Sequence, residues 1–206
     1  TQGVSGALVM NANPFTLGHQ YLAETAAAQC DTLHLFVLSE DASLVPFAVR
    51  KRLVQAGVAH IPNVVLHDSG PYIISSATFP SYFLKDAAAV IQGHARLDLA
   101  VFTKIAGVLN VTKRFVGEEP TSQVTGLYNE IMVRELPKAG IACHVVPRKQ
   151  AAGQAISAST VRLALKKGDW ETLKALVPQT TLDYFQSPEA APVLERIRKA
   201  DNVIHY

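Results

Sequence analysis

The sequence predicts an α/β fold with a doubly wound, parallel five-stranded sheet and C-terminal helices. The first observation is that short apolar runs alternate with segments of helical periodicity, at intervals of about thirty residues. This rhythm is typical of strand–helix–strand crossovers in a parallel sheet. The second is that a chain of 206 residues is long enough for one sizeable domain. The third is composition, because 49% apolar and 17% charged residues are typical of a globular chain rather than a disordered one.

Five apolar runs are the predicted strands. The first is ended by Asn13-Pro14, a pair that breaks regular structure, and the fifth is ended by Pro147. The predicted strands cover residues 6–10, 33–38, 64–66, 114–117 and 141–146.

Helices are predicted where apolar residues recur at helical spacing, as Val49, Leu53 and Val54 do. The stretch 71–89 is the least regular, with a helix expected from Ser81. We expect residues 1–166 to form the α/β domain and residues 167–206 a helical extension packed on it. The other predicted helices cover residues 20–29, 47–59, 99–109, 124–136, the stretch ending at 167, 169–177 and 188–199.

Charge and cysteine usage narrow the class of protein. A net charge of +2 is too small to indicate a nucleic-acid or membrane surface. Cys30 and Cys143 lie far apart in apolar segments, which predicts two buried, reduced thiols. No apolar run approaches the ~18 residues of a spanning helix, and no signal peptide is visible. We therefore expect a cytoplasmic protein, and from its abrupt start at Thr1 one domain of something longer.

The first chemical motif is Thr16-x-Gly18-His19, between the first strand and a helix. This turn places backbone N–H groups, a hydroxyl and an imidazole at a helix N-terminus, where a phosphate is stabilised. Gly18 has no side chain and therefore lets a phosphate approach the backbone closely. In doubly wound sheets ligands bind at the carboxyl ends of strands where the strand order reverses. This loop and the loop 117–120 follow the first and fourth strands.

The second motif is Ile156-Ser157-Ala-Ser159-x-x-Arg162, at a later helix start. Alone, each motif has an ordinary explanation: a capping or surface histidine, and a serine N-cap followed by an arginine. Their order along an α/β chain resembles the nucleotidyltransferase superfamily, whose Rossmann-like members include the pantetheine-phosphate and nicotinamide-mononucleotide adenylyltransferases. The resemblance implies that the two motifs hold the triphosphate of ATP from opposite sides.

A closer resemblance, to the citrate lyase ligase family, covers about residues 6 to 186. Its long block from Tyr72 to Lys85 is specific to that family. Members usually carry an N-terminal acetyltransferase-like domain, which the printed sequence does not include, as we expect if it is one domain of something longer. We can place no counterpart for the tail after Pro188. The similar stretches are 11–21, 72–85, 114–120 and Tyr128-Asn129.

The resemblance implies an acetate-activating reaction that uses ATP and Mg²⁺. Acetate attacks the α-phosphorus of ATP to give acetyl-adenylate and pyrophosphate. The acetyl group then passes to the thiol of the phosphoribosyl-dephospho-coenzyme A group on the acyl carrier subunit of citrate lyase. A carboxylate nucleophile is already ionised at neutral pH, so the site needs donors and positioning rather than a general base. No residue is predicted to bind a metal directly.

The resemblance also implies roles for individual residues. His19 would donate to the α- and β-phosphates in the transition state, Thr16 would bind the phosphates or the nucleophile, and Arg162 would clamp the β- and γ-phosphates with Ser157 and Ser159. The further nucleotide-binding candidates are Asn13, Phe15, Gly18, Gly117, Glu119 and Ile156.

Candidates for the acid or acyl side are Arg50, Tyr72 and Lys85, together with Phe79 and Tyr82. Each has an ordinary alternative. Arg50 would be a solvated charge beside its basic neighbours, the aromatic residues would belong to the core, and the lysine would lie on the surface. In the same way Glu119 would be half of an acidic pair at a helix start.

Two other functions remain open at this point. One is a plain adenylyltransferase that joins AMP to a phosphorylated metabolite such as phosphopantetheine, against which the block from Tyr72 to Lys85 argues. The other is a nucleotide-binding regulatory module without turnover, which the complete pair of motifs disfavours.

Overall fold

The computed structural model describes residues 3–82 and 88–204. The chain divides into two compact units, each built from segments that are distant in sequence. The sheet unit comprises the described parts of 1–10, 24–40 and 63–147, and the helical unit those of 11–23, 41–62 and 148–206. The expected boundary between residues 166 and 167 stays a prediction.

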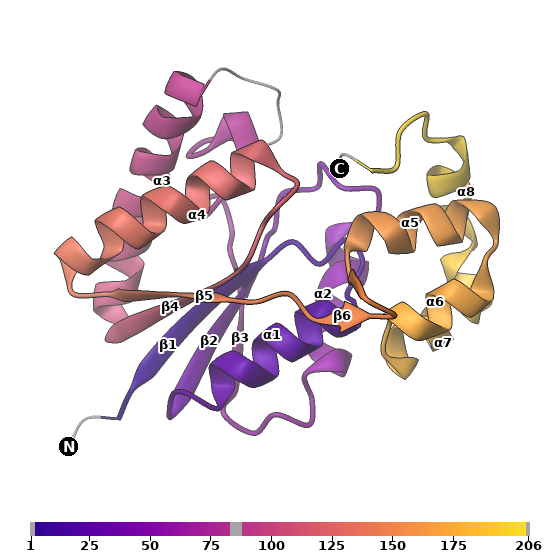
Figure 1. The fold of residues 1–206 in the computed structure, drawn as a ribbon, viewed down its shortest axis with the longest axis horizontal. Coiled ribbons are helices and arrows are strands. Elements are labelled where there is room, and N and C mark those ends of the chain that lie inside the picture. The colour runs from indigo at the N-terminus through magenta and orange to yellow at the C-terminus, as the bar shows by residue number, and fades with distance from the viewer. Residues whose placement is uncertain (1–2, 83–87, 205–206) are drawn as a thin grey trace. The chain divides into compact units, whose positions relative to one another are not determined.

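The sheet unit contains five parallel strands in the order β3-β2-β1-β4-β5 (Figure 1). The chain starts at the central strand, moves out to one edge, and then crosses to the other side, so the order reverses between β1 and β4. This confirms the predicted fold class. The strands are β1 (Ser5–Met10), β2 (Thr32–Val37), β3 (Val64–Asp68), β4 (Val111–Gly117) and β5 (Ala142–Val146).

Two helices, α3 (Ala88–Val108) and α4 (Gln123–Glu135), pack beside each other in the sheet unit (Figure 1). Their apolar sides join the sheet in one core cluster that includes Phe36, Phe102 and Ile131. Burial of such side chains stabilises the unit by roughly 1.5–3 kcal/mol each. The helix predicted over 99–109 corresponds only to the second half of α3, which begins at Ala88.

A buried carboxylate fixes the irregular segment between β3 and α3. Asp98 is fully buried and accepts hydrogen bonds from the Ile74 N–H at 2.6 Å and the Thr78 hydroxyl at 2.8 Å. The Tyr128 hydroxyl donates to its other oxygen. Because a buried carboxylate needs several donors, this network determines the path of the segment.

The helical unit holds α2 (Phe47–Gly57), a two-stranded hairpin and the C-terminal helices. Side-chain caps start two of these helices, because the Ser157 and Asp169 side chains accept from backbone N–H groups three residues later. The helix α1 (Leu17–Ala27) joins the two units along the chain. The remaining elements are β6 (Gln150–Ala151), β7 (Gln154–Ala155), α5 (Ala158–Lys167), α6 (Trp170–Leu176), α7 (Gln179–Gln186) and α8 (Ala191–Lys199).

Several sequence expectations need correction. The helix expected from Ser81 falls largely on residues outside the described part; Ser81 and Tyr82 lie in a 3-10 turn, Pro80–Tyr82, and α3 begins at Ala88. The helix expected over 188–199 begins as a 3-10 turn, Pro188–Ala190. The helix α7 and the β6–β7 hairpin were not predicted at all.

The two cysteines, Cys30 and Cys143, are free as predicted, but they are half-buried rather than buried. Burial raises the pKa of both thiols. Among the described residues, no helix has the length and apolar character needed to cross a membrane.

Candidate active site

The site begins in the loop after β1, where Thr16 is the N-cap of α1. Its hydroxyl oxygen accepts hydrogen bonds from the N–H groups of Gly18 at 3.2 Å and His19 at 3.3 Å. In return, the Thr16 N–H donates to Nδ1 of His19 at 3.0 Å. This is a reciprocal capping box with histidine in the place of the usual glutamate. The Thr16 side chain is 1% exposed and is engaged within the loop, so its predicted contact with phosphate stays a prediction.

The capping box fixes the tautomer of His19. Because Nδ1 accepts the Thr16 N–H, the proton of the neutral imidazole is assigned to Nε2, which leaves that nitrogen as a donor. Burial, and then the positive charges of Arg148 and Arg162, lower the pKa of His19 to about 4. The ring is therefore neutral at pH 7. The imidazole of His19 stacks on the ring of Phe15, with 5.7 Å between the ring centroids.

Several contacts hold the loop in place from behind. The Asn13 side-chain oxygen accepts from the Val45 N–H at 3.0 Å, and Arg50 donates to the carbonyls of Asn11 at 2.9 Å and Val45 at 3.0 Å. Phe15 is fully buried against Gly57, where a Cβ would lie 2.1 Å from the ring. The loop is thus closely packed around its phenylalanine.

Arg50 is fully buried, so the alternative of a solvated charge is wrong. Its burial lowers its pKa to about 10, which leaves it charged at neutral pH. A buried guanidinium requires acceptors, and the two loop carbonyls supply them. Its predicted contact with a phosphate or an acid substrate stays a prediction.

The second motif starts α5 and meets the first. The Ser157 hydroxyl accepts from the Thr160 N–H at 3.1 Å, which makes Ser157 the N-cap. Arg162 is 2% exposed, and its Nη1 donates to the carbonyl of Asn13 at 2.6 Å. A Cβ on Gly18 would lie 3.5 Å from the Ile156 carbonyl, so the two motifs also pack closely there. The structure therefore brings both predicted motifs together in the helical unit.

The remaining nucleotide candidates, Gly117 and Glu119, lie in the sheet unit. The Gly117 carbonyl accepts from the Asn129 side-chain amide at 2.9 Å. One Glu119 oxygen accepts from the N–H groups of Thr121 at 2.9 Å and Ser122 at 3.0 Å. This contact with the turn before α4 agrees with the helix-start alternative. Glu119 also lines an open cavity of about 410 Å³, so its contact with adenosine stays a prediction.

The candidates for the acyl side differ in exposure. Tyr72 is 60% exposed, so the alternative that it belongs to the core is wrong. Phe79 is fully buried in the core cluster, and Tyr82 packs on it, as that alternative expects. Lys85 lies outside the described residues.

Sequence reasoning missed three residues beside the site. Arg148 lies close enough to His19 to lower the pKa of the imidazole, and Lys149 places its ammonium 5.8 Å from the centroid of the Tyr21 ring. These two basic residues follow the end of the fifth strand, and ligands of such sheets bind at the carboxyl ends of strands, so their position in the sequence was a usable signal. Thr181 donates to the Phe15 carbonyl at 3.1 Å, but it lies on the unpredicted α7 and left no signal.

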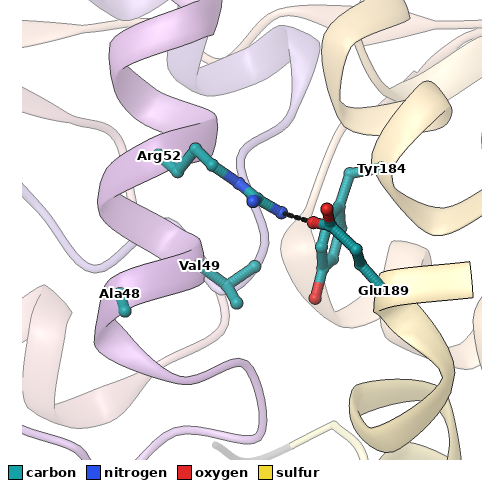
Figure 2. Close-up of a pocket in the computed structure, with 5 residues that line it drawn as sticks. All are labelled: Ala48, Val49, Arg52, Tyr184 and Glu189. Atoms are coloured by element: carbon teal, nitrogen blue, oxygen red, sulfur yellow. Dashed lines mark ion pairs between the residues drawn. The ribbon is translucent and has the colours of Figure 1, made fainter. Parts of the chain in front are cut away.

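A separate hollow lies beside α2, and Figure 2 shows its lining. It has a volume of about 200 Å³. One wall is Arg52, which pairs with Glu189 at 2.9 Å and lies over the ring of Tyr184 at 5.0 Å. Both partners of this ion pair are more than half exposed, so its contribution to stability is small. None of the predicted site residues lines the hollow.

The family assignment follows from sequence similarity. The protein-family model described as the citrate lyase ligase C-terminal domain matches residues 5–185 of this chain. This chain belongs to the citrate lyase ligase family. The [citrate [pro-3S]-lyase] ligase of Haemophilus influenzae is 46% identical over 187 residues, which cover 88% of this chain and 56% of that relative. The ligase of Klebsiella pneumoniae is 45% identical over 185 residues, which cover 87% of this chain and 54% of that relative. The chain thus spans about half the length of these curated relatives.

Solved structures agree with the fold class. A bifunctional NMN adenylyltransferase/ADP ribose pyrophosphatase from Francisella tularensis, complexed with AMP and a manganese ion, aligns with a TM-score of 0.56. The identity is 13%, over 96% of this chain and 52% of that one. Thermotoga maritima TmcAL, bound with alpha-thio ATP, aligns with a TM-score of 0.54 at 13% identity, over 93% of this chain and 56% of that one. At such identity the likeness establishes the nucleotidyltransferase-like fold alone.

Proposed function

We propose that this chain is the nucleotide-binding, acid-activating part of a citrate lyase ligase that acts in the cytoplasm. It binds ATP and acetate, forms acetyl-adenylate, and transfers the acetyl group to the phosphoribosyl-dephospho-coenzyme A thiol of the acyl carrier subunit of citrate lyase. Family membership supports the overall reaction, and the names of the relatives support the partner. The observation that carries the proposal is the hydrogen bond from Arg162 to the Asn13 carbonyl, which joins the second motif to the loop that carries the first.

In the first step an acetate oxygen attacks the α-phosphorus. The new oxygen–phosphorus bond forms as the bond to the bridging oxygen of pyrophosphate breaks, and pyrophosphate leaves with that oxygen. Negative charge grows on the phosphate oxygens, so the neutral His19 assists by donating from Nε2. Ser157, Ser159 and Arg162 at the start of α5 would hold the β- and γ-phosphates.

In the second step the thiolate attacks the acetyl carbon, the acyl–oxygen bond breaks, and AMP leaves with the bridging oxygen. Acetate needs no base, since a carboxylate is ionised at neutral pH, and the thiol loses its proton to solvent to form the attacking thiolate. The chain's own contribution is therefore to position the substrates and to stabilise charge on phosphorus. Tyr72 and Lys85 remain the proposed contacts on the acyl side.

Mg²⁺ fits this site as a companion of the triphosphate. The described residues hold no group of three His, Cys, Asp or Glu side chains that could hold a metal. Mg²⁺ commonly binds through substrate phosphates and water, so we propose that the triphosphate supplies most of its ligands. When bound, it neutralises charge on the phosphates.

Exchange between ATP and labelled pyrophosphate tests the proposal. With Mg²⁺, we expect exchange that requires acetate, because only a reversible adenylate step returns pyrophosphate to ATP. A parallel reaction with phosphopantetheine in place of acetate is the control for a plain adenylyltransferase. Exchange or product with phosphopantetheine alone would refute the ligase. ATP binding without either exchange would instead support a regulatory module.

A further inference from the structure

The segment 200–204, which we call the tail segment, follows α8 and returns to the start of α5. The Val203 carbonyl accepts from Nε of Arg162 at 2.6 Å. The Ile204 carbonyl accepts from Nη2 of Arg162 at 2.8 Å and from the Ser159 hydroxyl at 2.9 Å. The carbonyl of Ala200 accepts from the Lys166 ammonium. Four hydrogen bonds therefore run from α5 to tail-segment carbonyls.

These donors include two that the proposed function assigns to phosphate. Each nitrogen of the Arg162 guanidinium donates to a carbonyl, since the third one, Nη1, donates to that of Asn13. With the tail segment in place Arg162 is only 2% exposed. A triphosphate cannot reach the same nitrogens until the two carbonyls leave them.

The exchange of one ligand for the other is chemically reasonable. Carbonyl oxygens are neutral acceptors, whereas phosphate oxygens are ionised, and charge-assisted hydrogen bonds are roughly twice as strong. Besides these hydrogen bonds, the tail segment buries Val203, which is 4% exposed, and forms a turn in which the Asn202 side chain accepts from the Ile204 N–H at 2.8 Å. Ile204 itself keeps its side chain half exposed.

The structure also indicates where such a movement would start. The helix α8 is anchored by the buried Val193 and Ile197, and it ends at an extended Ala200. The backbone beyond Lys199 can therefore leave α5 without unpacking α8. The family model ends at residue 185, before any of these residues.

We propose that the tail segment is a built-in inhibitor that competes with the triphosphate of ATP for Ser159 and Arg162. This inference rests on the proposed function, since it takes the same two residues as the phosphate clamp. When only the open state binds, the apparent dissociation constant rises by the inverse of the open fraction. Burial of one valine side chain biases such an equilibrium by roughly 10- to 100-fold.

The test compares Val203→Ser with Ile204→Ser in the full chain. Both make the same kind of change in the same segment, but only the first removes a buried anchor. The probes are ATP with Mg²⁺ and inorganic tripolyphosphate, with dissociation constants from calorimetry. We expect Val203→Ser to tighten both about 10-fold or more. Ile204→Ser should stay within about twofold of the unaltered chain.

Hydrogen exchange gives a second readout on the unaltered chain. Either probe should raise exchange at the tail-segment amides while α8 stays protected. Unchanged or weaker binding by Val203→Ser would overturn the inference. So would a tail segment that stays protected with the probe bound, or a failure of both probes to bind any of the three proteins. Anion binding does not depend on adenylate chemistry, so a failure of acetate-dependent pyrophosphate exchange alone would refute only the proposed function.

Discussion

Replacement of His19 by asparagine separates the two tasks of this side chain. The imidazole accepts the Thr16 N–H through Nδ1, and we propose that it donates to phosphate through Nε2. An asparagine side-chain oxygen can reach the place of Nδ1, but asparagine has no counterpart of Nε2. His19→Asn therefore keeps the acceptor of the capping box and removes the proposed donor.

The expected size of the effect follows from what is lost. Removal of one preorganised donor to a charged transition state lowers kcat by about 10²–10³. His19→Ala removes the capping acceptor as well, and loss of such a contact costs about 0.5–2 kcal/mol of stability. We expect His19→Asn to melt within a few degrees of the unaltered chain and to bind ATP with little change.

The assay is acetate-dependent pyrophosphate exchange at saturating ATP, with calorimetry for ATP binding and a thermal melt as the control for folding. A kcat for His19→Asn within about threefold of the unaltered chain would refute the donor role. A loss confined to ATP affinity would also contradict it, because a contact made mainly in the transition state lowers kcat instead.

Three further predictions concern stability. The pKa of His19 is about 4 when folded against 6.5 normally, so the unfolded chain binds more protons between these values. Stability should rise with pH across that window by at most about 3 kcal/mol and level off above it, a dependence that His19→Asn should remove in denaturant titrations. Gly57→Ala places a Cβ 2.1 Å from the Phe15 ring and should lower the free energy of unfolding by about 1–3 kcal/mol, with a fall in kcat. The control is Gly93→Ala, whose Cβ would have nothing within 4 Å and which should be neutral or stabilising in thermal melts of both variants. Arg50→Met leaves two loop carbonyls without their donor and should cost about 2–4 kcal/mol by urea unfolding, and an unchanged midpoint would contradict this.

Periodicity and strand-end position were enough to predict the sheet and the position of the main site loop. The apolar run 6–10, followed by Asn13-Pro14 and Thr16-x-Gly18-His19, carries local signals for a strand, a break and a helix start. The structure confirms these elements, with boundaries that differ by at most three residues. Local signals succeed here because the capping contacts span only three positions.

Long-range contacts were beyond a local pattern. Arg50 stands beside Lys51 and Arg52, and this run of basic residues is typical of a solvated face, yet Arg50 bonds to a carbonyl 39 positions away. The contacts of Arg162 reach 149 positions back to Asn13 and 41 positions forward. The helix α7 was missed because a proline can follow the end of one helix or precede the start of another, and Pro178 precedes the start of α7.

The fate of oxygen from labelled acetate tests attack at the α-phosphorus most directly. The chain would be incubated with ATP, Mg²⁺ and [¹⁸O]acetate, with hydroxylamine as the acceptor that cleaves acetyl-adenylate, and AMP would be analysed by mass spectrometry. With both acetate oxygens labelled, we predict one ¹⁸O atom in the phosphate of each AMP formed, because an acetate oxygen becomes the bridging oxygen of the adenylate. Label in the pyrophosphate, or AMP without label, would contradict attack at the α-phosphorus.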